Sequence, residues 1–194
     1  MIYMIAGLAL FFGSHLYTTF RSRAPERDIR ARLGYGPYMG LYSLVAIAGI
    51  ALIAIGYDAM RPAAIIWVPP VWTKHLNITI QLLAFIILFA AYTPTGHIKK
   101  TLKHPMLVGV KLWSAGHLLA NGELNSIILF GSFLAYAVID RIMLKRRGDN
   151  GPPADLTPKL MGDGLAVLIG GGFWLAMLLW LHPVLFGVPV LPEG

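Results

Sequence analysis

Long apolar runs alternate with short polar connections along the chain. Crossing a bilayer takes about 20 helical residues, and six runs are of about that length: Ile2–Phe20, Tyr38–Tyr57, Leu76–Tyr92, Met106–Asn121, Asn125–Met143 and Gly164–Leu185. Because backbone polar groups find no water in hydrocarbon, each run is predicted to be a helix. The fourth run is the shortest and is interrupted by Lys111. The pattern predicts an all-α fold, a polytopic membrane bundle of about six transmembrane helices.

Composition indicates that residues 1–194 form a single integral membrane domain. Of the 194 residues, 57% are hydrophobic and only 13% are charged, which is more apolar surface than one soluble core of this size buries. The exterior is therefore expected to contact the lipid bilayer. The chain has no cysteine, which excludes disulfides, thiolate metal sites and cysteine nucleophiles.

Basic residues fall unevenly on the connections and predict an orientation. The first, third and fifth connections hold most of them: Arg21, Arg23, Arg27, Arg30, Arg32, Lys99, Lys100, Lys103, Arg141, Lys145, Arg146, Arg147 and Lys159. The second connection has only Arg61 and Lys74, and the fourth has none. The positive-inside rule then places the basic connections in the cytoplasm and both termini on the outer side of the membrane. The net charge of +7 comes from these basic connections, which are expected to face anionic lipid. No nucleic-acid partner is expected.

The second connection contains an apolar segment, residues 63–72, that is broken by prolines and carries two tryptophans. Tryptophan favours the interface between membrane and water. The segment is therefore predicted to lie in the outer interface, where it would cover the outer end of the bundle.

Two histidines lie inside predicted spans, His15 in the first and His117 in the fourth. Ionisable residues in hydrocarbon are costly, so both are candidates for function. Two neutral imidazoles that meet from facing helices make a site for a flat metal cofactor, and haem, with its iron, is the usual one. The alternative is that each imidazole only hydrogen-bonds a neighbouring helix.

Whether the two histidines lie at one depth depends on where the fourth helix meets the inner boundary of the bilayer. His15 is six residues from Arg21, about 9 Å along a helix. If Lys111, six residues before His117, marks the boundary, the depths agree. If His104 marks it, the depths differ by about 10 Å. Both placements stay open at this point.

Further candidates surround these histidines. Trp113, His117 and Asn121 lie at i, i+4 and i+8 on one helix face, so Trp113 is predicted to pack against the macrocycle and Asn121 to hold the imidazole. A polar and aromatic seam between helices explains the spacing equally well. Asp140 and Arg141 are expected to form an interfacial charge pair. The candidates for binding the propionates of the cofactor are Arg21, His104, Lys111 and Arg141.

Three stretches carry a family resemblance. They are residues 104–122 (HPMLVGVKLWSAGHLLANG), the pair Arg32-Leu33-Gly34 and Gly40-Leu41-Tyr42-Ser43, and residues 136–141 (YAVIDR). Together they resemble the NnrU family of small bacterial inner-membrane proteins, over nearly the whole chain. The resemblance implies an association with denitrification and nitric oxide metabolism, and a redox partner or respiratory complex.

The same domain forms the core of 15-cis-zeta-carotene isomerase, a haem b membrane enzyme that acts on an apolar substrate. The resemblance implies that His15 and His117 ligate the iron. The isomerase has a cysteine, an alternative ligand, at the position of Ser114, so thiolate ligation is not available to this chain.

Two other functions stay open. The pattern His104-Pro105…Gly109 is similar to the start of the cofactor helix in membrane methyltransferases that use S-adenosylmethionine. A non-catalytic accessory or assembly partner of a respiratory complex is the other alternative, and it predicts that both histidines can be replaced without loss of a pigment.

Overall fold

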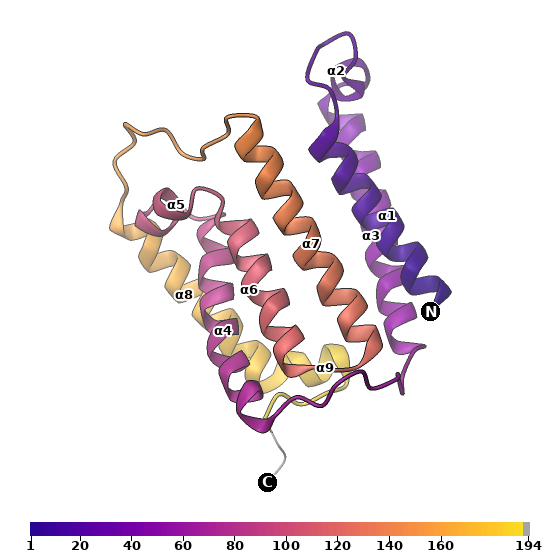
Figure 1. Cartoon of the computed structure of the whole chain (residues 1–194). Coiled ribbons are helices and arrows are strands. Elements are labelled where there is room, and N and C mark those ends of the chain that lie inside the picture. The colour runs from indigo at the N-terminus through magenta and orange to yellow at the C-terminus, as the bar shows by residue number, and fades with distance from the viewer. Residues whose placement is uncertain (192–194) are drawn as a thin grey trace.

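The computed structural model describes residues 1–191, which form helices joined by short connections (Figure 1). The helices are α1 (Ile2–Phe20), α2 (Ile29–Leu33), α3 (Tyr35–Asp58), α4 (Val71–Ala90), α5 (His97–Leu102), α6 (Pro105–Ala120), α7 (Leu124–Arg146), α8 (Leu160–Ala176), the π-helical turn η1 (Met177–Leu181) and α9 (His182–Phe186). Within residues 1–191 there is no β-strand, and a single β-bridge pairs Ile65 with Glu123. The predicted all-α fold is confirmed.

Each of the six predicted runs forms a helix. Five stretches are long and apolar enough to cross a membrane: α1, α3, α4, α7 and the continuous helical stretch Leu160–Phe186. The sixth predicted span, α6, has 16 residues, which makes it about 24 Å long against the roughly 30 Å of bilayer hydrocarbon. It begins at Pro105, because the first helical position needs no amide hydrogen. The chain is therefore a multi-pass protein with five candidate spans and one shorter helix.

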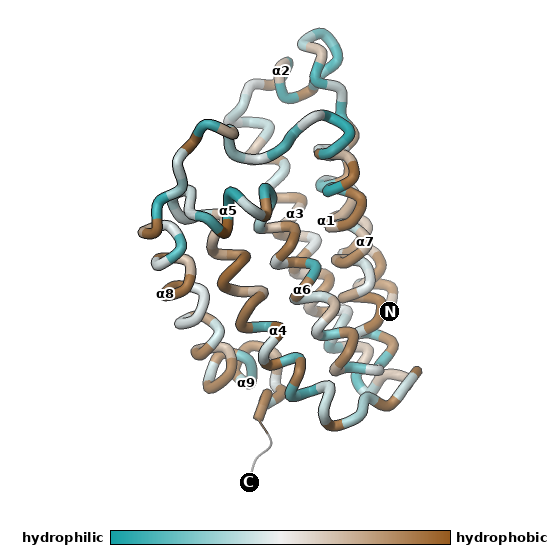
Figure 2. Tube along the Cα trace, turned by 60° about the vertical axis from the view of Figure 1, so that its left-hand side comes forward, coloured by the Kyte–Doolittle hydropathy of each residue, from teal (hydrophilic) through white to brown (hydrophobic). Residues whose placement is uncertain are grey.

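The long helices lie beside one another in the order α3, α1, α7, α6, α4 and α8 (Figure 1). Successive long helices of the chain run in opposite directions, so α2, α5 and the 147–159 connection gather at one end, which we call the basic end. The start of α1 and helix α9 lie at the other end. Figure 2 shows hydrophilic residues concentrated at the basic end and apolar residues along the helices.

Glycines bring α1 and α3 into close contact. A Cβ atom on Gly56 would lie 2.2 Å from the backbone nitrogen of Met4, and one on Gly7 would lie 2.6 Å from that of Ile53. Small residues let helix backbones approach, and van der Waals packing then drives association in lipid. The buried side chains of this contact are Met4, Leu8, Phe12 and Ile53.

The second connection lies against the turn between α6 and α7. The amide of Ile66 donates to the carbonyl of Gly122 at 2.8 Å, and the amide of Leu124 donates to the carbonyl of Ala64 at 2.8 Å. A Cβ atom on Gly122 would lie 1.8 Å from the carbonyl oxygen of Trp67, so only glycine fits this contact. The segment therefore covers the end of α6 that is remote from the basic end.

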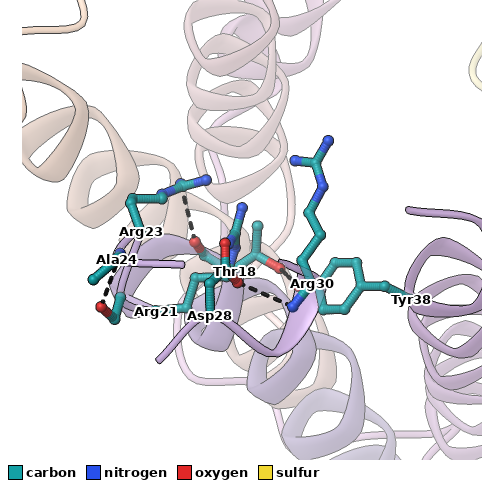
Figure 3. A network of polar contacts seen from close by, with 8 residues as sticks. Thr18, Arg21, Arg23, Ala24, Asp28, Arg30 and Tyr38 are labelled. Carbon is teal, nitrogen blue, oxygen red and sulfur yellow. Dashed lines mark hydrogen bonds and ion pairs between the residues drawn. The ribbon is translucent and has the colours of Figure 1, made fainter. Parts of the chain in front are cut away.

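A polar network fixes the connection between α1 and α3 at the basic end (Figure 3). Arg21 forms an ion pair with Asp28, and this hydrogen bond lowers the pKa of the Asp28 carboxyl. The same carboxyl accepts from the amide of Arg30 at 3.0 Å and so caps α2. The hydroxyls of Thr18 and Tyr38 are 3.0 Å apart and tie α1 to α3.

Candidate ligand-binding groove

A cavity of about 440 Å³ opens beside α7 at the basic end, and we call it the groove. Helix α7 packs against α1 on one side and α6 on the other, so residues of these three helices form the walls, and α5 and the end of α4 complete the mouth. The lining residues are Phe11, His15, Ala91, Lys99, Lys103, His104, Pro105, Met106, Leu107, Val110, Phe133, Tyr136, Asp140 and Leu144.

The groove is apolar inside and basic at its mouth. Phe11 and Phe133 both line it and contact each other, with ring centroids 5.4 Å apart, while Lys99, Lys103 and His104 line the mouth and Asp140 is the acidic residue of the lining. The Nζ of Lys99 donates to the carbonyl of Ala91 at 2.8 Å and so satisfies the end of α4. A cavity of this kind suits an amphipathic molecule with a flat apolar body and an anionic end.

His15 lies on the α1 wall of the groove among aromatic rings. Its ring stacks on Phe11 at 4.1 Å and contacts Tyr42 and Tyr136 at 5.2 and 5.5 Å. The Nδ1 atom is 2.7 Å from the carbonyl oxygen of Phe11. Because a carbonyl only accepts, Nδ1 carries the hydrogen, and the neutral ring keeps its free lone pair on Nε2. Metal-binding histidines commonly have this arrangement.

His117 has different surroundings. Its ring lies flat on Phe130, with centroids 4.3 Å apart and planes at 5°. The Nδ2 amide of Asn121 donates to the His117 carbonyl at 2.9 Å and lies 3.3 Å from Nδ1 of the ring. Since an amide nitrogen donates, Nδ1 is the acceptor and Nε2 carries the hydrogen of the neutral ring. His117 is not among the residues that line the groove.

The structure does not bring His15 and His117 to one point. His15 contacts Tyr136 and His117 stacks on Phe130, and these α7 residues are six positions apart, about 9 Å along the helix. Phe133 and the Trp113 ring, 5.3 Å apart, lie between the two levels. Imidazole–metal bonds are about 2 Å long, so the two rings do not flank a common metal in this arrangement.

The other predicted site residues are dispersed. Trp113 contacts His117 at 5.4 Å and lines a smaller cavity of about 160 Å³ between α4 and α6. His104 lines the groove, and its Nε2 is 3.1 Å from the carbonyl of Asp149. Lys111 lies outside the lining, and Arg21 is engaged with Asp28. Of the predicted residues, the groove thus brings together His15 and His104.

The prediction that Asp140 and Arg141 form a charge pair was wrong. Asp140 lines the groove and accepts from the hydroxyl of Thr19 on α1 at 2.7 Å, whereas Arg141 is absent from the ion pairs of residues 1–191. Neighbours on a helix point about 100° apart, so the two side chains reach different helices. Asp140 was not predicted to line a ligand site, although its spacing from Phe133 and Tyr136, at i+7 and i+4, places all three on one face.

His182 on α9 lies near His117, a contact that was not predicted from the sequence. Its ring lies 6.5 Å from that of His117, and its Nδ1 is 2.7 Å from the carbonyl of Val188. No spacing in the sequence indicates this contact, because the π-helical turn η1 sets the direction of α9. In the part of the chain that the structure describes, no group of three or more His, Cys, Asp or Glu side chains is placed to hold a metal ion.

These features define a multi-pass α-helical membrane protein with an amphipathic groove between its helices. The chain belongs to the NnrU family, because the family model described as "NnrU protein" matches residues 3–190. Comparison with curated proteins and with solved structures gave no significant match.

Proposed function

We propose that this NnrU protein binds haem b in the groove, with His15 as the protein ligand to the iron. The observation that supports the proposal is the free lone pair on Nε2 of His15, in a ring that lines a cavity with aromatic walls and a basic mouth. Haem b is a flat apolar macrocycle with two carboxylates at one edge, so its two ends match the two parts of the groove. When bound, it would supply redox chemistry and gas binding.

The chain's own residues hold such a ligand in distinct ways. Phe11, Phe133 and Tyr136 offer aromatic faces for stacking, and Lys103 and His104 offer donors to carboxylates at the mouth. The carbonyl of Phe11 fixes the His15 ring by its bond to Nδ1. Among the four residues predicted to contact propionates, the groove retains only His104, and the neighbouring Lys99 and Lys103 replace the others.

Ligation by both His15 and His117, as the resemblance implies, requires a rearrangement along the helix axes by about 9 Å. We propose that His15 alone would hold the iron, and that the bound haem would supply binding of a gas or an apolar substrate. This chemistry suits the link to nitric oxide metabolism or to isomerase-like activity that the family resemblance implies.

We further propose that α6 also crosses the bilayer, that both termini are periplasmic, and that the membrane is the bacterial inner membrane. Support comes from the alternating direction of the six long helices and from the gathering of α2, α5 and the 147–159 connection at one end (Figure 1). Because α6 is shorter than the hydrocarbon is thick, the bilayer would thin locally around it, or long side chains flanking α6 would extend to the interface. Labelling from the periplasmic side of the single-cysteine variants Ile2→Cys and Thr101→Cys tests the orientation; only the first is expected to react.

The absorption spectrum of the protein purified after haem supplementation tests the function. A Soret band is expected, and Lys103→Glu should weaken haem binding about fivefold, since an exposed ion pair contributes up to about 1 kcal/mol. Lys145→Glu, an exposed residue outside the groove, is the matched control and should bind normally. A wild-type protein without a Soret band contradicts the proposal and favours the non-catalytic partner, or, if S-adenosylmethionine binds, the methyltransferase.

A further inference from the structure

Two basic side chains lie on the seam between α6 and α7, away from the groove. Phe130 packs on Trp113 and His117 of α6, so it marks the face of α7 that contacts α6. Arg141 is eleven residues further on, three helical turns, and therefore lies on that same face toward the basic end. On α6, Lys111 lies one turn before the fully buried Ser114, also toward the basic end.

Both cations therefore lie along this seam toward the basic end, near enough for the charge of Arg141 to oppose that of Lys111. Neither side chain takes part in an ion pair among residues 1–191. The Nη1 of Arg141 is buried without a hydrogen-bond partner among residues 1–191. A buried donor and like charges are costly when they have no acceptor, so an anion held between Lys111 and Arg141 would offset both costs.

We propose that the α6–α7 seam binds the phosphate of an anionic phospholipid between Lys111 and Arg141. A lipid is favoured over a free phosphate because Arg141 has apolar, exposed neighbours on α7: Val138 is 41% exposed and Ile142 is 47% exposed. Acyl chains can pack on this surface. The seam opens toward the basic end, where anionic lipid headgroups gather in the cytoplasmic leaflet.

Native mass spectrometry of the full chain in mild detergent tests the proposal, with phosphatidylglycerol and phosphatidylcholine as the probes. The wild type should retain phosphatidylglycerol preferentially. Lys111→Gln with Arg141→Gln should weaken its binding at least about tenfold, given the attraction of anionic lipid to each basic residue. Lys145→Gln with Arg146→Gln makes the same change of charge at the exposed end of α7 and should change binding less than about twofold.

Three outcomes overturn the proposal: no preference for phosphatidylglycerol in the wild type, an equal loss in the control pair, or displacement of the lipid by inorganic phosphate at the lipid's own concentration. The last result would assign the seam to a soluble anion. The double variant Lys111→Arg with Arg141→Lys keeps both charges and should retain lipid binding. Comparison with the double glutamine variant then separates loss of the site from misfolding. A normal Soret band in the double glutamine variant would show that the groove is a separate site.

Discussion

His15 and His117 are both histidines within long apolar segments, yet their rings are held in opposite ways. A carbonyl oxygen holds Nδ1 of His15 and leaves the lone pair of Nε2 free beside the groove. An amide nitrogen meets Nδ1 of His117, so that Nε2 carries the hydrogen, and the ring is packed flat on Phe130. The first arrangement suits a metal ligand and the second suits a packed side chain. A histidine in a span is thus informative only once the partner of each ring nitrogen is known.

Replacing Phe130 should give the largest change in stability and leave haem binding in place. Phe130→Ala removes a ring that packs on both Trp113 and His117, and we expect a loss of about 3 kcal/mol, as for other buried phenylalanines. Thermal unfolding in detergent, followed by circular dichroism, measures it. Phe20→Ala, at a position that is 57% exposed, is the control. Loss of haem without loss of stability would place His117 in the site and break the contrast between the histidines.

The contact between α1 and α3, which positions the His15 wall of the groove, should give the next largest change in stability when it is altered. Gly56→Ala places a Cβ atom against the backbone of Met4, and separating α1 from α3 should cost about 2 kcal/mol, as overpacking does elsewhere. Gly40→Ala lies on the same helix with open space around it and should be neutral. Thermal midpoints of the two variants, measured in parallel, decide the matter. Equal midpoints would show that close approach of these helices does not hold the wall.

The smallest effect is expected at the Arg21–Asp28 ion pair beyond the end of α1. The pKa of Asp28 is lowered by Arg21, so the pair stabilises the fold at neutral pH. That contribution should be lost as the pH falls below the ordinary aspartate pKa of about 4. Asp28→Asn keeps a capping side chain but loses the charge. The stability difference between wild type and this variant should therefore shrink on acidification, and a difference that grows would contradict the assignment.

The helices were predictable from sequence because backbone groups in hydrocarbon must pair within their own segment. Pro105 even marked the start of α6, since proline fits the first helical turn. The level of His117 relative to His15 was not predictable. It depends on which residues of α6 pack against α4 and α7, and hydropathy does not encode that packing.

The groove itself was only partly visible in the sequence. His15 was found because ionisable residues inside apolar runs are costly, and His104 was found as a candidate donor to the propionates. Phe11, Phe133 and Tyr136 were missed, because an aromatic residue in a membrane helix is ordinary and only the neighbouring positions of α1 and α7 bring these rings together. The lateral order of the helices, with α7 between α1 and α6, creates the groove and follows from no local pattern.

The ratio of bound haem to protein in His15→Ala and His117→Ala tests the central claim most directly. After expression with added haem, His15→Ala should lose most of its haem, and added imidazole should restore part of the Soret band by replacing the missing ligand. His117→Ala should keep a haem content close to that of the wild type while melting at a lower temperature. Equal loss of haem from both variants would contradict the account, since it would mean that both rings ligate one iron.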